Sequence, residues 1–395
     1  MSDDLGAMSL ELHRRLGGKL GTYSRVPIRN QQDLSLAYTP GVAAVSKAVA
    51  DDPTLSFDLT IRGNTVAIVS DGSAVLGLGN IGPLGALPVM EGKAILFQEY
   101  AGLTAFPICL DTQDPDEIVR TVRLLAPSVG GINLEDISAP RCFAIEAALQ
   151  DLGIPVMHDD QHGTAVVVLA ALLNACKVTG RELAETRVVI NGAGAAGVAI
   201  ARLLRCVGQD PNVCIPVRDV LVCDSKGILG PNRSDLNPTK QTLLKYTNRD
   251  KRSGSLADAL GSADVFVGVS RGNLLSAADV RRMNDGPIIF GLANPVPEIM
   301  PAVALEAGAA IVGTGRSDFG NQINNVLAFP GIFRGAMDAR SPVISDEMKI
   351  AAAHALAAMV TQPTADCVIP SPLDRSVAHR VAEAVKRAAQ GSDHD

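Results

Sequence analysis

The stretch Arg187-Val-Val-Ile-Asn-Gly-Ala-Gly-Ala-Ala-Gly197 decides how this chain is expected to fold. Its pattern predicts a short buried strand, Val188–Ile190, followed at once by a Gly-x-Gly-x-x-Gly turn and an Ala-rich helix. In such a crossover the first glycine allows the turn, the second admits a pyrophosphate, and the third lets helix and strand pack closely. The helix N-terminus then faces the phosphates with its partial positive charge. The residues predicted at a dinucleotide cofactor are therefore Gly192, Gly194, Ala195, Ala196 and Gly197.

The choice between NAD and NADP depends on the residues after the next predicted strand, Val220–Cys223. Asp224 closes that strand, and an acid at this place favours the free ribose 2′-hydroxyl of NAD. However, Ser225-Lys226 follows directly, and Arg218 and Arg233 are near in the sequence. Any of these can receive a 2′-phosphate, so the sequence leaves both NAD and NADP open.

Strand-like and helix-like segments alternate on both sides of this crossover. We therefore predict an α/β protein, with an N-terminal α/β substrate domain followed by a Rossmann-type doubly wound NAD(P)-binding domain. Apolar runs predict strands at residues 65–69, 105–110, 131–134, 155–158, 187–190, 220–223, 264–269, 287–292 and 309–312. Helical spacing predicts helices at residues 9–16, 86–102, 115–126, 140–153 and 162–177, and from the glycine turn to about 207. The composition turns polar at 181–185, so we divide the chain into domains 1–180 and 181–395. A C-terminal helical segment can pack back on the first domain.

Composition and charge restrict the class of protein. With 395 residues, 47% of them hydrophobic and 19% charged, the chain can bury two cores. The formal net charge of −7, without a basic patch, argues against nucleic-acid and membrane-surface partners. The seven cysteines form no CxxC pair or regular spacing, which argues against a zinc site and a disulfide framework. The acidic start has no signal-peptide pattern, and no apolar run approaches the ~18 residues of a membrane span. We expect a cytoplasmic protein.

A second Gly-x-Gly-x-x-Gly, Gly77–Gly82, lacks the context of the first. Pro83 and Gly85 follow it and oppose an immediate long helix. We interpret this motif as a tight loop on the substrate side.

Acidic residues follow two predicted strands of the first domain. Glu135 and Asp136 come after one strand, and Asp159 and Asp160 come after the next. The carboxyl ends of parallel strands lie at one edge of a sheet, so these acids can converge there. Taken singly, each acid is more often a helix N-cap or a solvated residue. Together, three carboxylates suit a hard divalent ion, Mg²⁺ or Mn²⁺.

Four other residues have side chains that suit a carboxylate substrate. Lys93 stands beside an apolar helical run, where desolvation would lower its pKa and make it a usable base near neutrality. An exposed lysine with a buried stem is the structural alternative. Tyr38 precedes a turn signal, although a lone tyrosine is ordinarily a packing residue. Asn294 and Asn325 stand in predicted loops, where their amides can hold a carboxylate.

Several blocks of the chain, in this order, resemble the signatures of the malic enzyme family. They are Tyr38-Thr-Pro-Gly-Val-Ala43, Ser70-Asp-Gly-Ser73 with Leu76-Gly-Leu-Gly-Asn-Ile-Gly82, Glu91-Gly-Lys93, Asn133-Leu-Glu-Asp-Ile137, His158-Asp-Asp-Gln-His-Gly-Thr164, Leu292-Ala-Asn-Pro-Val-Pro-Glu298 and Asn324-Asn-Val-Leu-Ala-Phe-Pro-Gly331. The resemblance runs from about residue 10 to 385, and the length is similar to that of the short bacterial form.

This resemblance implies an oxidative decarboxylation of (S)-malate to pyruvate and CO₂, with reduction of NAD(P)⁺ and dependence on Mg²⁺ or Mn²⁺. In that reaction Lys93 takes the proton of the C2 hydroxyl, Asp159 orients Lys93, and Tyr38 delivers a proton to C3. Asn325 binds substrate, and Asn294 lies at both substrate and cofactor. The residues implied as metal ligands are Glu135, Asp136 and Asp160. The ion would polarise the C2 carbonyl as CO₂ leaves.

The resemblance also implies a homodimer, in which we expect Tyr38 to reach the active site of the partner subunit. One position departs from the family pattern, because larger members carry an Arg that grips a malate carboxylate where this chain has Ala74. Backbone amides near Ala74, the two asparagines or an Arg from elsewhere must then take that role. The family's allosteric sites have no matching motif here.

Two other functions compete with this interpretation. An amino-acid dehydrogenase also places a substrate domain before a Rossmann domain and uses a lysine, but it needs no convergent carboxylates. A non-catalytic NAD-binding regulator would tolerate the loss of Lys93 or of the acids. Metal dependence separates the first alternative from a malic enzyme, and activity separates the second.

Overall fold

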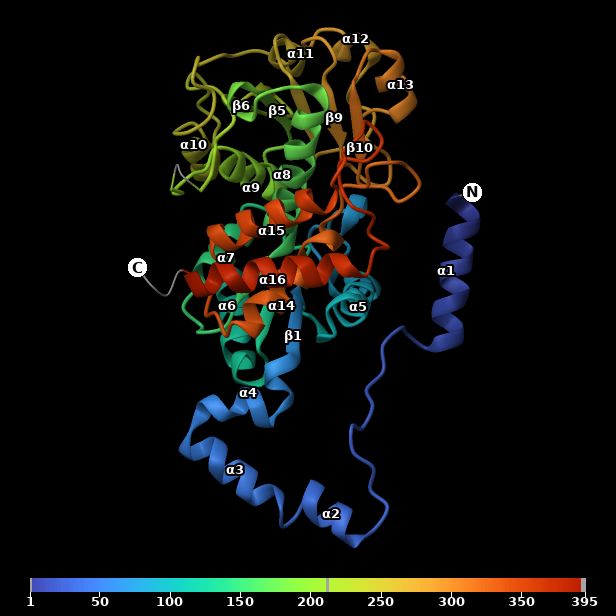
Figure 1. Cartoon of the computed structure of the whole chain (residues 1–395), viewed down its shortest axis with the longest axis vertical. Coiled ribbons are helices and arrows are strands. Elements are labelled where there is room, and N and C mark those ends of the chain that lie inside the picture. The colour runs from blue at the N-terminus through green and yellow to red at the C-terminus, as the bar shows by residue number, and fades with distance from the viewer. Residues whose placement is uncertain (1, 211–212, 392–395) are drawn as a thin grey trace.

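The computed structural model describes residues 2–210 and 213–391 and contains two sheets with helices packed around them (Figure 1). The first sheet is fully parallel, in the order β2-β1-β3-β4. Its strands are β1 (Thr65–Ser70), β2 (Thr104–Cys109), β3 (Gly131–Leu134) and β4 (Val156–His158). The strand order changes direction between β1 and β3, so the loops after these strands open a crevice at the carboxyl edge of the sheet.

The second sheet has the order β10-β9-β8-β5-β6-β7, and only β7 is antiparallel to its neighbour. Its strands are β5 (Arg187–Asn191), β6 (Asp219–Asp224), β7 (Gly227–Ile228), β8 (Val265–Gly268), β9 (Ile288–Gly291) and β10 (Ile311–Thr314). This is the doubly wound strand order, in which the short antiparallel β7 is the third strand along the chain and forms one edge of the sheet. The predicted fold class is confirmed.

Helices connect the strands and cover the sheets. The α-helices of this part of the chain are α5 (Gly82–Ala101), α6 (Pro115–Leu125), α7 (Arg141–Ala148), α8 (Asp159–Thr179), α9 (Ala195–Leu204), α10 (Pro238–Leu243), α11 (Leu256–Leu260), α12 (Ala277–Val280) and α13 (Pro301–Glu306). Short 3-10 turns are η1 (Pro53–Leu55), η2 (Ile61–Asn64), η3 (Leu76–Leu78), η4 (Ala126–Ser128), η5 (Leu183–Glu185) and η6 (Asn325–Leu327). By length and composition α8 could cross a membrane, but two thirds of its apolar window is buried inside the protein. It is therefore well explained as a core helix.

The C-terminal helices pack back on the first half of the chain, which the sequence allowed. They are α14 (Phe329–Asp338), α15 (Asp346–Met359) and α16 (Ser376–Gly391). The buried Asn174 of α8 donates hydrogen bonds to the carbonyls of Ala357 (2.8 Å) and Val368 (3.0 Å). Phe97 of α5 makes an edge contact with Phe329 at 4.8 Å between ring centroids. The strands of the first sheet precede residue 180 in the sequence, and those of the second sheet follow it. The division into two domains there stays a prediction.

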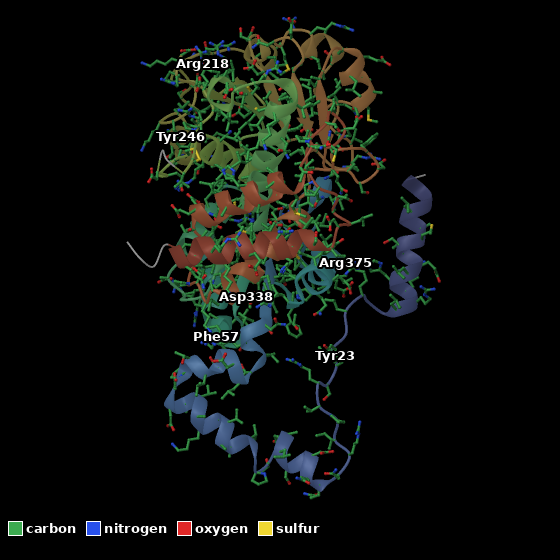
Figure 2. All side chains as sticks on the ribbon, in the orientation of Figure 1. Tyr23, Phe57, Arg218, Tyr246, Asp338 and Arg375 are labelled. Carbon is green, nitrogen blue, oxygen red and sulfur yellow. A yellow bond between two sulfur atoms is a disulfide. The ribbon has the colours of Figure 1, made fainter. Side chains whose placement is uncertain are left out.

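The N-terminal arm, residues 2–59, extends away from this body (Figure 1). It contains α1 (Ser2–Leu16), α2 (Gln31–Ala37), α3 (Val42–Asp51) and α4 (Ser56–Leu59). None of the residues of α2 and α3 is buried. Figure 2 shows Tyr23 on the extended segment between α1 and α2, and its side chain is 81% exposed. The arm thus exposes many apolar side chains to solvent.

Three predictions about local structure are wrong. Helix α5 begins at Gly82 although Pro83 follows, because a proline in the first turn of a helix gives up no intrahelical hydrogen bond. Helix α8 begins at Asp159 rather than at 162, because Asp159 and Asp160 in its first turn interact favourably with the helix dipole. Cys206 and Cys214 form a disulfide in the segment after α9. No cysteine motif in the sequence indicated this pair, because the fold of that segment brings the two sulfurs together. The other five cysteines are free.

Candidate active site

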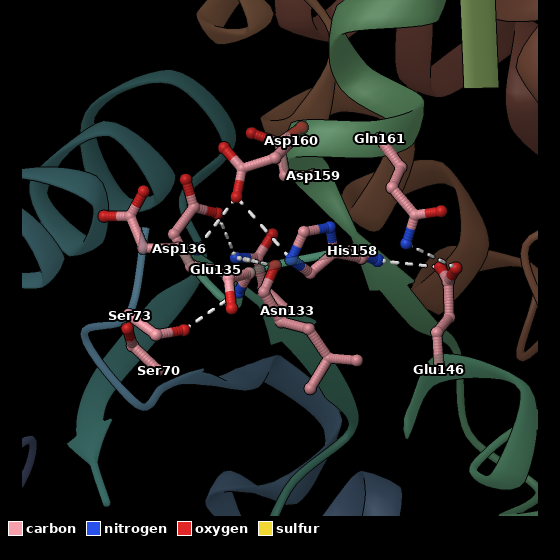
Figure 3. A network of polar contacts seen from close by, with 12 residues as sticks. Ser70, Ser73, Asn133, Glu135, Asp136, Glu146, His158, Asp159, Asp160 and Gln161 are labelled. Atoms are coloured by element: carbon pink, nitrogen blue, oxygen red, sulfur yellow. Dashed lines mark hydrogen bonds and ion pairs between the residues drawn. The ribbon is translucent and has the colours of Figure 1, made fainter. Parts of the chain in front are cut away.

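The predicted acids converge at the carboxyl edge of the first sheet. Glu135 and Asp136 directly follow β3, and Asp160 lies in the first turn of α8. One carboxylate oxygen from each of the three lies within 4.8 Å of the others. The amide of Asp136, a residue with a left-handed φ of 54°, donates to Asp160 Oδ2 at 2.8 Å (Figure 3). We call Glu135, Asp136 and Asp160 the carboxylate triad.

Lys93 projects from α5 into the same cluster. Its Nζ donates to Glu135 Oε1 at 2.5 Å and also to Asp159 Oδ2, and it lies 4.3 Å from the ring centroid of Phe329. Burial by itself lowers the pKa of Lys93, but the charges of Asp159 and Glu135 outweigh burial and raise the pKa above its ordinary value. The expectation that desolvation alone brings this pKa near neutrality is therefore wrong. The sequence did not show that two carboxylates contact the ammonium.

Carboxyl groups outnumber cations in this cluster. Burial raises the pKa values of Glu135 and Asp160, and it raises that of Asp159 to about 8 although Lys93 opposes the shift. The triad and Asp159 thus place four carboxyl groups around one ammonium. Carboxylate oxygens at this mutual spacing are the donors that Mg²⁺ and Mn²⁺ prefer, so the residues present fit a divalent ion.

A cavity of about 1070 Å³ lies in front of the cluster. Lys93, the triad, Asn294 and Asn325 all line it, so the structure brings the predicted substrate residues together. Ala195 and Ala196 of the glycine turn line it as well. The substrate side and the cofactor side therefore share one space.

The predicted cofactor turn lies over the carboxyl ends of β5 and β6. A second cavity of about 850 Å³ is lined there by Gly192, Gly194 and Asp224. Gly192 has a φ of 131°, and a Cβ on it would lie 2.6 Å from the carbonyl oxygen of Val269. A Cβ on Gly197 would lie 1.7 Å from the Gly192 carbonyl oxygen. The first and third glycines are therefore required by the turn and by helix–strand packing.

Two basic side chains already pair with the carboxylate of Asp224, the residue expected to select NAD. Arg233 pairs with both of its oxygens, at 2.7 and 3.0 Å, and Lys240 Nζ lies 2.7 Å from Oδ2. Burial raises the pKa of Asp224, but hydrogen bonds from Arg233 and Lys240 outweigh it and hold the pKa at about 2. Arg218, also considered for a 2′-phosphate, instead pairs with Glu185. Sequence reasoning missed Lys240, because α10 folds it back over a separation of 16 residues.

Tyr38 does not join the other predicted residues. It caps the C-terminal end of α2, its side chain is 68% exposed, and it is not among the described residues that line the cavity. Ala74 does line the cavity, and its amide donates to the carbonyl of Asp136 at 2.9 Å. The one predicted catalytic residue on the N-terminal arm is therefore separate from Lys93 within a single chain.

Glu146 of α7 is a site residue that the sequence analysis missed. Its carboxylate accepts hydrogen bonds from the amide of His158 (2.8 Å) and from Gln161 Nε2 (3.0 Å) (Figure 3). It also lies 3.0 Å from His162 Nε2. These three residues flank Asp159 and Asp160, so Glu146 fixes the turn that carries both acids. No spacing signal links α7 to that turn; only the fold does.

Comparison with known proteins agrees with this geometry. Residues 17–150 match the malic enzyme N-terminal domain, and residues 161–390 match the malic enzyme NAD-binding domain. The chain belongs to the malic enzyme family. This confirms the family resemblance and the assignment to NAD(P)-dependent oxidoreductases of malate.

Individual relatives carry both cofactor names. The chain is 55% identical to a bifunctional malic/malolactic enzyme of Bacillus subtilis, over 96% of this malic enzyme and 92% of the relative. It is 48% identical to an NADP-dependent malic enzyme of Rhizobium meliloti, over 94% of the chain and 50% of the relative. The crystal structure of an NAD-dependent malic enzyme from Thermotoga maritima superposes with a TM-score of 0.91 at 51% identity, covering 95% of this chain and 98% of that one.

Proposed function

We propose that this malic enzyme oxidises and decarboxylates (S)-malate to pyruvate and CO₂ in the 1070 Å³ cavity, with metal ligands and catalytic groups as follows. The observation that carries the proposal is the position of Lys93, which lies between Glu135 and Asp159 beside the carboxylate triad. The same cavity reaches the glycine turn, so a hydride can pass from substrate to nicotinamide within one space.

The carboxylate triad would hold Mg²⁺ or Mn²⁺. When bound, the ion supplies a Lewis acid for the developing enolate and a positive charge that opposes the ammonium form of Lys93. Lys93 then takes the proton of the C2 hydroxyl, while Asp159 keeps its Nζ in place. Asn294 and Asn325 orient the substrate carboxylates with their amides.

The cofactor side supports turnover with either NAD or NADP. Because Arg233 and Lys240 neutralise Asp224, this acid is a weak barrier to a 2′-phosphate. Lys226 lines the same cavity and pairs with Asp235, which also pairs with Arg233. Three cations therefore face two acids here, which leaves an excess of positive charge. We therefore expect both dinucleotides to be reduced.

Tyr38 protonates C3 in the active site of a partner subunit, so the functional unit is a homodimer. The exposure of Tyr38 and of the apolar side chains of the N-terminal arm supports this arrangement. A cytoplasmic location is also proposed. Five of the seven cysteines are free, which favours a reducing compartment, whereas the Cys206–Cys214 disulfide does not.

Initial rates with L-malate and Mn²⁺, run in parallel with NAD and NADP and repeated after EDTA treatment, test the proposal. We expect pyruvate formation with both cofactors, loss of activity with EDTA and recovery with Mn²⁺. Turnover that survives EDTA would indicate a metal-independent dehydrogenase. Absence of turnover by the folded protein with Mn²⁺ would contradict the proposed reaction.

A further inference from the structure

The further inference rests on the proposed malate reaction and concerns the second carboxylate of the substrate. The carboxylate triad serves the hydroxyl end of malate through a divalent ion. Lys93 is already engaged by Glu135 and Asp159. Ala74 faces the cavity but carries no charge, and its amide is used by the Asp136 carbonyl. The amides of Asn294 and Asn325 also line the cavity and can orient a carboxylate, but they are neutral. Neutralising the second charge of a dicarboxylate therefore needs a further positive group.

Lys19, which follows α1, lines the same cavity as Lys93. Its Nζ donates to the carbonyl of Pro88 at 2.8 Å, on the turn of α5 that precedes Lys93. A Cβ on Gly92, the neighbour of Lys93, would lie 3.5 Å from this Nζ. Among the described residues that line the cavity, Lys19 and Lys93 are the only lysines, there is no arginine, and His13 is the one histidine.

Helix α5 holds Lys19 in this position. The amide of Lys19 donates to Glu91 Oε2 at 2.9 Å, which ties the segment after α1 to the helix that carries Lys93. The ammonium uses one N–H on Pro88 and keeps two for a ligand. Within residues 2–210 and 213–391, no carboxylate lies within ion-pair distance of this ammonium. An ammonium that forms no ion pair with any described residue thus lines the substrate cavity.

We infer that Lys19 binds the C4 carboxylate of malate and selects dicarboxylic over monocarboxylic substrates. The carboxylate accepts a charge-assisted hydrogen bond from Nζ before the chemical step, and the C3–C4 bond then breaks to release CO₂. Since this contact is present in the ground state, its loss raises KM more than it lowers kcat.

The test compares Lys19→Ala and Lys19→Arg with the wild type on two substrates. L-Malate carries the C4 carboxylate, whereas pyruvate, reduced with NAD(P)H and Mn²⁺, lacks it. For Lys19→Ala we expect the KM for malate to rise about tenfold or more, with kcat within about threefold and the kinetics of pyruvate unchanged. Lys19→Arg should recover most of the affinity for malate. Lys251→Ala, at an exposed lysine outside the cavity, is the matched control.

Calorimetric titration with L-malate provides a readout that does not depend on turnover, and it should show the same loss of affinity. An unchanged KM and unchanged affinity for malate in Lys19→Ala would overturn the inference and leave the proposed function intact. An equal loss with malate and pyruvate would assign Lys19 a structural role and would also overturn it. If the wild type itself fails to oxidise malate, the proposed function fails and the inference fails with it.

Discussion

Glu146 stabilises the turn between β4 and α8 without touching the substrate cavity. Its carboxylate binds His158, Gln161 and His162 at distances of 2.8 to 3.0 Å, so three groups around the two acids of α8 depend on one side chain. Burial raises the pKa of Glu146, but the charge and hydrogen bond of His162 outweigh burial and hold the pKa at about 2, against an ordinary 4.5. The ionised form is therefore favoured by folding.

This predicts a pH-dependent loss of stability in Glu146→Gln. The folded pKa lies below the unfolded one, so the contribution of Glu146 is complete above pH 4.5 and is lost as the pH falls toward 2. Near pH 7 the free energy of unfolding should fall by about 3 kcal/mol. Urea unfolding of both proteins between pH 7 and pH 4 measures this difference, which should begin to shrink below pH 4.5. A difference that grows as the pH falls would contradict the assignment.

At the scale of elements, the junction of β4 and α8 determines where two acids of the candidate site lie. Asp159 and Asp160 are adjacent in the sequence but serve different partners, since one contacts Lys93 and the other belongs to the carboxylate triad. The first turn of a helix separates neighbouring side chains by about 100° and can therefore aim two acids in two directions. Gly163, one turn later, leaves room for the side chain of Asp159.

We expect Gly163→Ala to inactivate the enzyme. A Cβ at this position would lie 1.8 Å from Asp159 Oδ1 and 3.1 Å from the Cβ of Asn325. The Asp159 carboxylate, whose other oxygen contacts Lys93, must therefore move. The rate of malate oxidation should fall by about 100-fold or more, because displaced catalytic groups lose their alignment. The matched control is Gly261→Ala, whose Cβ would meet nothing closer than 3.6 Å. Initial rates and circular dichroism of both variants make the comparison, and near-normal activity of Gly163→Ala would show that the junction can relax.

At the scale of the whole molecule, the N-terminal arm leaves apolar side chains exposed in a single chain. Its exposed apolar side chains include Leu5, Met8, Leu36 and Tyr38, with exposed fractions from 60% to 69%. Apolar surface of this extent is typical of protein–protein contacts. A second copy of the chain that covers the arm would place Tyr38 against another molecule.

Mixing two inactive variants tests this arrangement. Heterodimers of Tyr38→Phe with Asp160→Asn contain one site with an intact triad and a tyrosine from the other chain, so they should recover about half of the wild-type activity. If Tyr38 served its own chain, both sites of the heterodimer would be defective. Co-expression with two affinity tags isolates the heterodimer for the rate measurement, and each homodimer serves as its control.

Local sequence was enough for the sheets and for much of the site. The strand–glycine–helix pattern of residues 187–197 predicted the crossover, because Gly192 and Gly197 meet backbone atoms that no side chain could avoid. Glu135 and Asp160 could be placed together because the ends of adjacent parallel strands share one edge of a sheet. These inferences needed only local conformation and strand order.

Contacts between residues far apart in the chain could not be predicted from the sequence. The pKa of Lys93 reversed its expected direction because two carboxylates from other elements contact the ammonium. Lys240 reaches Asp224, Glu146 reaches His158, and Lys19 reaches α5 only through packing. By itself the sequence determined the fold class, the cofactor turn and the set of acids, since these follow from backbone geometry and residue type. Only the tertiary structure decided which charges face one another, because electrostatic interactions depend on distance in space and not along the chain.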